Sequence, residues 1–308
     1  MQAESCSRLV ELYKKNHNIK SSEKLIFEGT DGMDVYNITA PFEDDGRKII
    51  AGRVEKRCSE NSKTVFFYNH GNVWRPLEEA CTYDLQDPFV CKIGNDIVFG
   101  GVKTYPHPEI KCALGYKTEF YKGSSIKDLK KFAQGPEMMK DIRLIELNGG
   151  SIGIFSRPQG KIGGRGKIGF TILKSLDDLN EEVINAAPLI ENQFADGEWG
   201  GTNELHILKN GVIGILGHIA KFDEEGNRHY YPMTCLFDPK VRKSSGIKII
   251  AVRDDIPYGD AKRPDVKDVL FSGGILRRED GYAELFLGVS DAEAYKLIIE
   301  DPFDEYEK

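Results

Sequence analysis

The chain contains 308 residues, of which 40% are hydrophobic and 30% charged, a composition that excludes disorder as its general state. Its formal net charge of -7 argues against a broad nucleic-acid-binding face, and the lack of any apolar run of about 18 residues argues against a membrane span. The 32 glycines, spread through apolar segments, favour many short strands and turns over a helical bundle.

The N-terminal segment predicts one short amphipathic helix, over about residues 3–15. Leu9, Val10, Leu12 and Tyr13 can share one face of that helix. The segment has no apolar signal core, and the six cysteines of the chain form no Cys-x-x-Cys pair. We therefore expect reduced thiols, a cytoplasmic location and no zinc site.

Five later segments share one plan. A polar residue opens an apolar strand, a turn follows, and a second apolar strand ends in glycine, with a basic side chain after it in most copies. The copies run over residues 37–53, 87–103, 141–157, 203–218 and 272–288. Their two ends are 16 residues apart in four copies and 15 residues apart in the fourth copy. Units of about 45–65 residues with about four strands are typical of the blades of a β-propeller.

The predicted fold class is therefore all-β: one five-bladed β-propeller domain over residues 1–308, in which about residues 1–23 form a helical extension. The last copy is one strand short, and the segment KLIFEG (24–29) could supply the missing strand and close the ring. A β-sandwich would not explain five copies at this period. A β/α barrel would need long helical patterns between the strands, which this sequence lacks.

The repeat predicts two sets of polar side chains around one mouth. The first strand of a propeller blade lines the central channel, and the antiparallel second strand ends beside its start. A concave site lined by converging polar groups is the default ligand site. The first set contains Asp34 or Asn37, Asp87, Asp141, Asn203 with Glu204, and Ser272. The second set contains Arg53, Lys103, Arg157 and His218.

Each of these residues taken alone also fits a structural role, since Asp and Asn at a strand start often bond turn amides. Their recurrence at one position of the repeat favours a shared site. Asp87 is the strongest candidate, because Pro88 removes a backbone donor and fixes the chain. A carboxylate at such a mouth can have a raised pKa, which suits a general acid. The cationic set could hold a phosphate or another compact anion.

Five motifs carry a family resemblance over about residues 25–303. They are GTDGMDVYNITAPF, YDLQDPFV, GGRGKIGFT, GTNELHIL and VLFSGGILRREDGYAELFLGVSDAEAY. The chain resembles the β-1,2-mannosyltransferase/phosphorylase family, which is glycosyltransferase family 108 and was formerly a domain of unknown function. That family is related to the mannoside phosphorylases of glycoside hydrolase family 130. In this resemblance Asp87 falls on the catalytic aspartate of the Gln-Asp-Pro motif.

The resemblance implies a reversible, inverting transfer of mannose between mannose 1-phosphate, or a nucleotide-mannose, and β-1,2-mannooligosaccharides. It also implies that Asp87 is the general acid in phosphorolysis and the base in synthesis, acting through a sugar hydroxyl, while phosphate attacks the opposite face. The expected partners are mannose, mannose 1-phosphate, inorganic phosphate and β-1,2-mannooligosaccharides. No metal and no cofactor is required.

The remaining site residues are predicted from the repeat geometry. Phosphate contacts are expected from Arg53, Lys103, Arg157, His218 and Tyr231, with Tyr230 an equal candidate to Tyr231. Contacts to sugar hydroxyls are expected from Asp34, Asn37, Asp141, Asn203 and Glu204.

Two alternatives stay open. The first is an inverting glycoside hydrolase acting on β-mannosides, with Asp34, Asp87 and Glu204 as its carboxylates; free phosphate would then not change the rate. The basic residues count against this alternative, because a hydrolase needs two carboxylates and water alone. The second is a non-catalytic carbohydrate-binding propeller, which would need an inert or missing acid. The sequence does not determine the oligomeric state.

Overall fold

The computed structural model describes residues 3–17 and 19–307, and most of its regular structure is β-strand. The helices in this part are α1 (Cys6–Lys15), α2 (Gly160–Gly163) and α3 (Glu181–Asn185), with short 3-10 turns at Leu176–Asp178, Arg253–Asp255, Pro264–Val266 and Asp304–Tyr306. The expected all-β class with a short N-terminal helix is therefore confirmed. The predicted domain and extension include residues 1, 2, 18 and 308, which lie outside the described residues.

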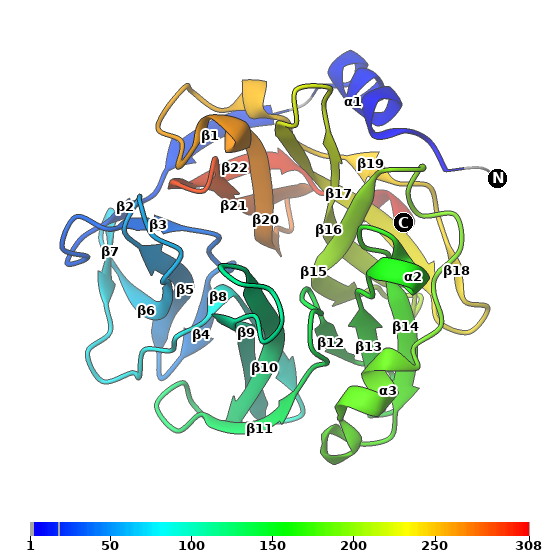
Figure 1. Ribbon diagram of the computed structural model, residues 1–308, viewed down its shortest axis with the longest axis horizontal. Coiled ribbons are helices and arrows are strands. Elements are labelled where there is room, and N and C mark those ends of the chain that lie inside the picture. Colours follow the sequence, from blue (N-terminus) through cyan, green and yellow to red (C-terminus); the bar gives the residue numbers. More distant parts are fainter. Residues whose placement is uncertain (1–2, 18, 308) are drawn as a thin grey trace.

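The strands form consecutive, mainly antiparallel groups that lie around the centre of the molecule (Figure 1). Group 1 contains β2 (Ile26–Phe27), β3 (Asp34–Tyr36), β4 (Phe42–Asp44), β5 (Arg47–Glu55), β6 (Lys63–His70) and β7 (Val73–Pro76). Group 2 contains β8 (Gln86–Ile93), β9 (Asp96–Pro106), β10 (Leu114–Gly123) and β11 (Lys130–Gln134). Group 3 contains β12 (Arg143–Glu146), β13 (Ile152–Ser156) and β14 (Gly169–Leu173).

The last two groups are hydrogen-bonded into one nine-stranded sheet. Group 4 contains β15 (Trp199–Ile207), β16 (Ile213–Phe222), β17 (Arg228–Asp238), β18 (Lys243–Ser244) and β19 (Lys248–Ile249). Group 5 contains β20 (Asp268–Arg277), β21 (Tyr282–Val289), β22 (Glu293–Glu300) and β1 (Ile19–Lys24). The connection between the groups is a short parallel pairing of β17 with β20, in which His229 is opposite Asp268 and Tyr230 is opposite Val269.

The N-terminal segment pairs with the last group, as expected, but through an earlier stretch. Residues 19–24 form β1 and pair antiparallel with β22, whereas Ile26 and Phe27 form β2 and pair with β7 of group 1. The segment 24–29 is therefore divided between the two groups. Residues near the start of the chain join the last group to the first.

Hydrophobic clusters fill the spaces between neighbouring groups. One cluster joins Phe66 of group 1 to Phe99 of group 2, and another joins Phe120 of group 2 to Ile154 of group 3. The three other clusters contain Phe155 with Met233, Leu216 with Leu285, and Phe67 with Phe286. Each group is thus packed against the next, and the fifth against the first.

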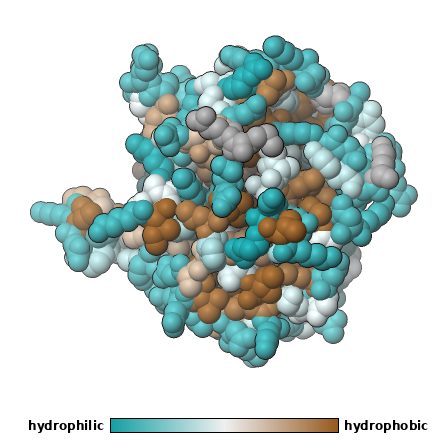
Figure 2. Space-filling view, turned by 90° about the vertical axis from the view of Figure 1, so that its right-hand side faces the viewer, coloured by the Kyte–Doolittle hydropathy of each residue, from teal (hydrophilic) through white to brown (hydrophobic). Residues whose placement is uncertain are grey.

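The helix α1 lies on the outside of group 4, near β19 (Figure 1). Ser5 caps its N-terminus, and Cys6 and Leu9 bury their side chains in the cluster around Phe155. The carboxylate of Glu198 accepts a hydrogen bond from the backbone N–H of Cys6 at 2.8 Å, which fixes the start of the helix. Figure 2 shows the right-hand face of the molecule, where hydrophobic residues are interspersed among hydrophilic ones. Within residues 3–17 and 19–307, no helix is both long enough and apolar enough to cross a bilayer.

Candidate active site

The repeated polar positions share an unusual backbone. Asn37, Asp87 and Asp141 have φ angles of 45°, 50° and 59°, in the left-handed region that residues other than glycine rarely adopt. In copies two, four and five the strand pairing also shifts register here: β8 bulges after Gln86, β15 around Asn203 and β20 after Ser272. Such irregularities redirect side chains and occur near active sites. The sequence repeat is therefore also a repeat of backbone geometry.

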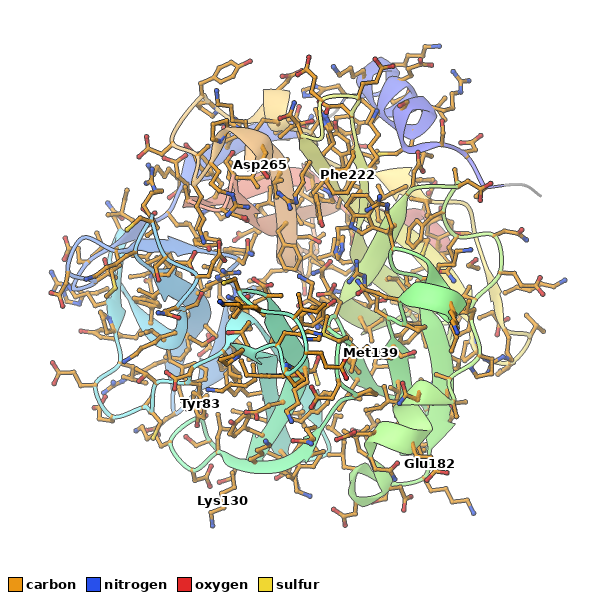
Figure 3. The ribbon with its side chains drawn as sticks, in the orientation of Figure 1. Tyr83, Lys130, Met139, Glu182, Phe222 and Asp265 are labelled. Atoms are coloured by element: carbon orange, nitrogen blue, oxygen red, sulfur yellow. The ribbon has the colours of Figure 1, made fainter. Side chains whose placement is uncertain are left out.

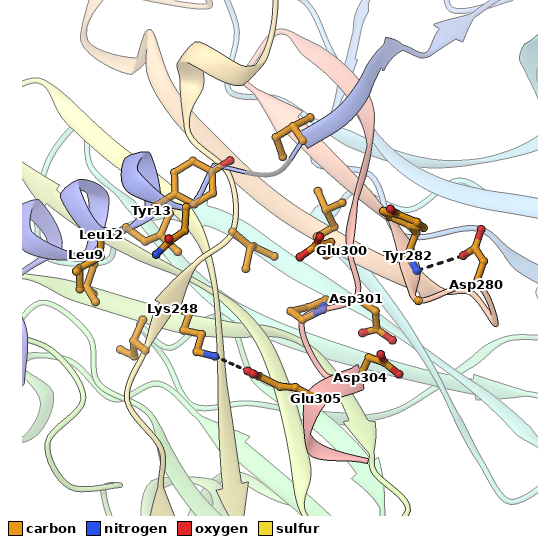
Figure 4. Close-up of a pocket in the computed structure, with 18 residues that line it drawn as sticks. Leu9, Leu12, Tyr13, Lys248, Asp280, Tyr282, Glu300, Asp301, Asp304 and Glu305 are labelled. Atoms are coloured by element: carbon orange, nitrogen blue, oxygen red, sulfur yellow. Dashed lines mark hydrogen bonds and ion pairs between the residues drawn. The ribbon is translucent and has the colours of Figure 1, made fainter. Parts of the chain in front are cut away.

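A cavity of ≈ 220 Å³ lies where these positions converge. It collects side chains from segments far apart in the sequence. One of them is Val266, the residue after Asp265, which is labelled in Figure 3. Six of the predicted site residues line it: Asn37, Arg53, Asp87, Asp141, Arg157 and His218. All six are buried. The structure therefore brings together one part of each predicted set.

Asp87 is held by an amide and a guanidinium. Its Oδ1 accepts a hydrogen bond from Nδ2 of Asn37 at 2.7 Å and another from Nη1 of Arg53 at 3.2 Å. Burial raises the pKa of Asp87, but the positive charges of Arg53 and Lys140 outweigh burial and lower it below its ordinary value. The raised pKa expected for an acid at this position is therefore wrong for the ligand-free protein, where Asp87 is ionised at neutral pH.

Asp141 and Arg157 form a second buried pair. Nη1 of Arg157 lies 3.3 Å from Oδ2 of Asp141, without hydrogen-bond geometry, and Nε of Arg157 donates to the carbonyl oxygen of Gly200 at 2.8 Å. Burial raises the pKa of Asp141, but Arg157 and Lys140 bring it down to about 2. Both carboxylate oxygens of Asp141 and Nη1 of Arg157 have no hydrogen-bond partner among the described residues. Buried polar groups in this state are oriented to receive a polar ligand.

His218 is neutral in this environment. Burial lowers its pKa to about 3, although the nearby carboxylate of Asp141 opposes this. Nδ1 of His218 lies 2.8 Å from Oδ1 of Asn203, which also accepts a hydrogen bond from Ser272. The ring is stacked on Tyr230, with 5.5 Å between the centroids. Asn203 therefore lies behind His218 and holds its ring, and does not itself line the cavity.

Besides Asn203 and Ser272, four predicted residues lie away from the cavity lining. Asp34 forms a bidentate pair with Arg57, and Glu204 accepts hydrogen bonds from His206 and from the backbone N–H of Ile275. The other two, Lys103 and Tyr231, are displaced by strand alternation.

Lys103 on β9 and Arg53 on β5 occupy corresponding repeat positions, but their side chains point to opposite faces of their sheets. On β9 Lys103 shares a face with Phe99, which packs back against group 1, whereas Arg53 shares a face with Ala51 and points forward to group 2. The pairing explains this: Tyr36 is opposite Arg53, but the corresponding Gln86 is opposite Val102. A shift of one residue reverses the face of a side chain. Lys103 instead lies 3.6 Å from Asp84.

Tyr231 and Tyr230 point to opposite sides of β17. Tyr230 and its parallel neighbour Val269 line the cavity. Tyr231 donates a hydrogen bond to Asp268 at 2.6 Å, in a separate cleft of ≈ 320 Å³. The sequence left Tyr230 and Tyr231 as equal candidates, and Tyr230 is the one that lines the cavity.

The sequence predictions missed five ionisable groups of the cavity: Lys140, Asp291, Glu60, Arg228 and Arg263. Lys140 precedes Asp141 directly and forms no hydrogen bond or ion pair within residues 3–17 and 19–307; burial lowers its pKa, but Asp141 and Asp87 raise it overall. Asp291 has a left-handed φ of 52° and likewise lacks a partner there. Burial raises the pKa of Asp291, and Asp87 adds to this against the opposing charge of Arg53. Lys140 is adjacent to a repeat position, but Asp291 lies three residues beyond the last copy and carried no repeat signal.

Comparisons with known proteins were made for the whole chain. The family profile described as a protein of unknown function (DUF1861) matches residues 11–305. A comparison with curated proteins found no match. Among solved structures, the chain is similar to MPT-4, a mannose phosphorylase from Leishmania mexicana in complex with a phosphate ion. The identity is 34% and the TM-score 0.90, over 98% of this chain and 95% of that one.

Two further structures are similar. MPT-1, a GDP-Man-dependent mannosyltransferase from Leishmania mexicana, has 34% identity and a TM-score of 0.89, over 99% of this chain and 96% of that one. A β-1,2-mannobiose phosphorylase from Listeria innocua has 14% identity and a TM-score of 0.63, over 91% of each chain. At this lower identity, the likeness concerns the fold alone.

Proposed function

This chain belongs to the DUF1861 family, and on that basis we propose that it is an enzyme that transfers mannose, a mannoside phosphorylase or mannosyltransferase. One observation carries the proposal. A single buried cavity contains a carboxylate positioned by an amide and a guanidinium, beside cationic groups that have uncommitted hydrogens. A phosphorylase needs one acid/base and a place for phosphate, and this cavity supplies both.

The proposed reaction is reversible and inverting, on β-1,2-linked mannose. In phosphorolysis, a phosphate oxygen attacks the anomeric carbon, the glycosidic C–O bond breaks with its electron pair on the leaving oxygen, and that oxygen takes the proton of Asp87. In synthesis, an acceptor hydroxyl attacks the anomeric carbon of mannose 1-phosphate, phosphate leaves with the electron pair, and Asp87 takes the hydroxyl proton. A sugar hydroxyl relays the proton in either direction.

The electrostatics of Asp87 fit both directions when phosphate is included. Without ligand, Arg53 and Lys140 keep the pKa of Asp87 low, so the carboxylate is ready to act as a base. A phosphate bound beside Lys140 and Arg157 would neutralise this positive field and raise the pKa of Asp87. Phosphate would therefore promote the protonated form that phosphorolysis requires.

We assign the other roles on geometry. Arg157, Lys140 and His218 are the proposed phosphate contacts, with Arg53 acting mainly on Asp87. Asn37, Asp141 and Asp291 are the proposed contacts for sugar hydroxyls, and Asn203 positions His218. Asp34, Glu204, Lys103 and Tyr231 have no role in this proposal, because they do not line the cavity.

One observation supports the hydrolase alternative, namely a second carboxyl group near Asp87. Asp34 and Glu204, the second and third carboxylates predicted for a hydrolase, lie outside the cavity, but Asp291 places another carboxyl near Asp87. A pair of carboxyl groups with opposite pKa shifts can serve as acid and base. Phosphate dependence separates the two mechanisms, because water replaces phosphate in hydrolysis.

The five-bladed propeller is part of the same proposal. It is supported by five strand groups, by hydrophobic clusters that join each group to the next, and by β1, which joins the last group to the first. A single domain follows from this arrangement. The cytoplasmic location remains a prediction, supported by the six cysteines, all of which are unpaired.

The proposal is tested by mannosyl transfer. The protein is incubated with mannose 1-phosphate and mannose, and released phosphate and β-1,2-mannobiose are measured. Asp87→Asn is expected to lower the rate by about 10²–10⁴-fold, the usual contribution of a general acid/base. Release of mannose from β-1,2-mannobiose at a rate independent of phosphate would instead establish the hydrolase.

The matched control is Asp44→Asn. Asp44 is also a buried carboxylate that accepts a hydrogen bond, from Ser125 at 2.9 Å, but it lies outside the cavity. We expect this variant to retain its transfer rate within about twofold. Equal losses in the two variants would mean that Asp87 contributes to folding and not to the reaction.

A further inference from the structure

The exposed edge of the active-site cavity carries a chain of ion pairs, here called the rim belt: Glu60, Arg263, Asp265 and Arg228. Glu60 lies between β5 and β6 of group 1, Arg263 and Asp265 lie in the segment before β20, and Arg228 begins β17. Three of these four side chains line the cavity. The belt therefore runs past three neighbouring strand groups, from group 1 past group 5 to group 4.

Glu60 lies at one end of this belt and contacts three cations. Its Oε1 lies 3.0 Å from Nη1 of Arg263 and 3.0 Å from Nζ of Lys262, and its Oε2 lies 3.5 Å from Nη2 of Arg53. Three cations thus share one carboxylate, although that carboxylate is about half exposed. Arg263 is also paired with Asp265 at 3.1 Å, and Lys262 with Glu55.

The cations at the mouth and those deeper in the cavity differ in the hydrogen bonds that they already make. Each cation of the rim already donates a hydrogen bond to a carboxylate. Deeper in the cavity, Arg157 is paired with Asp141 at 3.3 Å, but its Nη1 makes no hydrogen bond, and Lys140 makes no hydrogen bond or ion pair in the described part of the chain. One phosphate can therefore be bound at depth, whereas a second phosphate nearer the mouth would meet the carboxylate of Glu60 and no free cation.

The volume of the cavity also favours a ligand with one phosphate over a ligand with two. At ≈ 220 Å³ it lies below the roughly 300–1,000 Å³ typical of pockets for drug-sized ligands. A hexose with one phosphate is smaller than such ligands, but a sugar joined to a nucleoside diphosphate is larger. A neutral sugar chain could still extend past Glu60, since its hydroxyls donate hydrogen bonds to carboxylates.

We propose that the donor of this enzyme carries a single phosphate, as mannose 1-phosphate does, and that the rim belt excludes nucleotide sugars. This inference rests on the proposed function and decides which of its two donors the cavity accepts. Glu60 is thereby a specificity-determining residue, which acts by committing Arg263 and Lys262 and by repelling a second phosphate.

The test is a calorimetric titration of the full chain with inorganic phosphate, GDP and GDP-mannose. We expect phosphate to bind at least tenfold more tightly than GDP. In Glu60→Gln, which keeps the size of the side chain and removes its charge, GDP affinity is expected to rise at least tenfold while phosphate affinity changes less than threefold. The ratio of turnover with GDP-mannose to turnover with mannose 1-phosphate should likewise rise in Glu60→Gln.

The control is Glu28→Gln. Glu28 is also about half exposed and is paired with an arginine, Arg75, at 2.8 Å, but it lies far from the cavity lining. The inference is overturned if the unmodified protein binds GDP as tightly as phosphate, if it does not bind phosphate, or if Glu60→Gln changes GDP affinity no more than Glu28→Gln does. Because binding is measured without turnover, tight phosphate binding with no mannosyl transfer would reject the proposed function and leave the choice of ligand intact.

Discussion

Buried charge defines the active site at the scale of single residues. Asp87 and Asp141 have lowered pKa values because each faces a buried arginine, and Lys140 acts on both. Burial also lowers the pKa of His218, so that its ring is neutral. The cavity therefore holds fixed negative and positive charges side by side before any ligand binds.

The neutral state of His218 predicts an acid-sensitive fold. The unfolded chain protonates this histidine near its ordinary pKa of about 6.5, but the folded chain does so only near about 3. The unfolded state thus binds more protons between these values, and stability falls as the pH drops. Each pH unit below about 6.5 should remove up to about 1.4 kcal/mol. Denaturant unfolding at pH 7, 6 and 5 measures this loss, which His218→Gln should reduce.

The control for this measurement is His70→Gln. His70 is exposed in the folded protein, as it is in the unfolded chain. This variant should show the same pH dependence as the unmodified protein. An unchanged pH dependence in His218→Gln would mean that other groups cause the acid sensitivity.

Some site residues could be predicted from the sequence because they recur at one repeat position. Asn37, Asp87 and Asp141 share that position and a left-handed backbone, and all three line the cavity. Lys140 and Asp291 could not be found in this way, since neither occupies a repeat position. Their place at the cavity depends on packing between groups, which a repeat within one group does not encode.

At the scale of single elements, strand alternation decides which cations reach the cavity. Lys103 and Arg157 have the same sequence offset, yet only Arg157 lines the cavity. We expect Arg157→Ala to weaken phosphate binding by at least tenfold, because a charged hydrogen bond contributes about 1.5–3 kcal/mol. Lys103→Ala should change it by less than about twofold. Calorimetric titration with inorganic phosphate distinguishes the two, and equal effects would contradict the register described for β9.

The strands themselves were predicted unequally well. Paired apolar strands such as β15 and β16 are buried in long continuous runs, and the sequence repeat located them. The strand β1 has the sequence IKSSEK and is mostly exposed, so no hydrophobic pattern marks it. Backbone hydrogen bonds to β22 hold it in place. This explains why the closing segment was expected at 24–29 and occurs at 19–24.

At the scale of the whole molecule, β1 joins the end of the chain to its beginning. Its ion pairs Lys24–Glu293 and Glu23–Lys296 add to the backbone pairing with β22. Deleting residues 1–24 should therefore lower the melting temperature by about 5–10 °C more than deleting residues 1–17, which removes α1 and keeps β1. Thermal unfolding followed by circular dichroism measures the difference. Equal melting temperatures would show that β1 does not contribute to the closed arrangement.

The closed arrangement of the five strand groups could be predicted from the sequence only in part. The number of groups follows from the number of repeat copies. The merging of groups 4 and 5 into one sheet depends on two residue pairs between β17 and β20, and such a short parallel contact has no sequence signature. The rim belt likewise joins segments more than 200 residues apart, as the contact between Glu60 and Arg263 shows.

The left-handed backbones of the cavity carry an evolutionary consequence. Asn37, Asp87, Asp141 and Asp291 each hold a conformation that costs on the order of 1–3 kcal/mol for a residue other than glycine. Selection for thermostability alone would replace some of them with glycine, which adopts this conformation freely. Selection for turnover would resist each replacement, because it removes a polar group from the cavity. Variants that gain heat resistance at these four positions are therefore expected to be poor enzymes, so adaptation to heat must proceed through other parts of the chain.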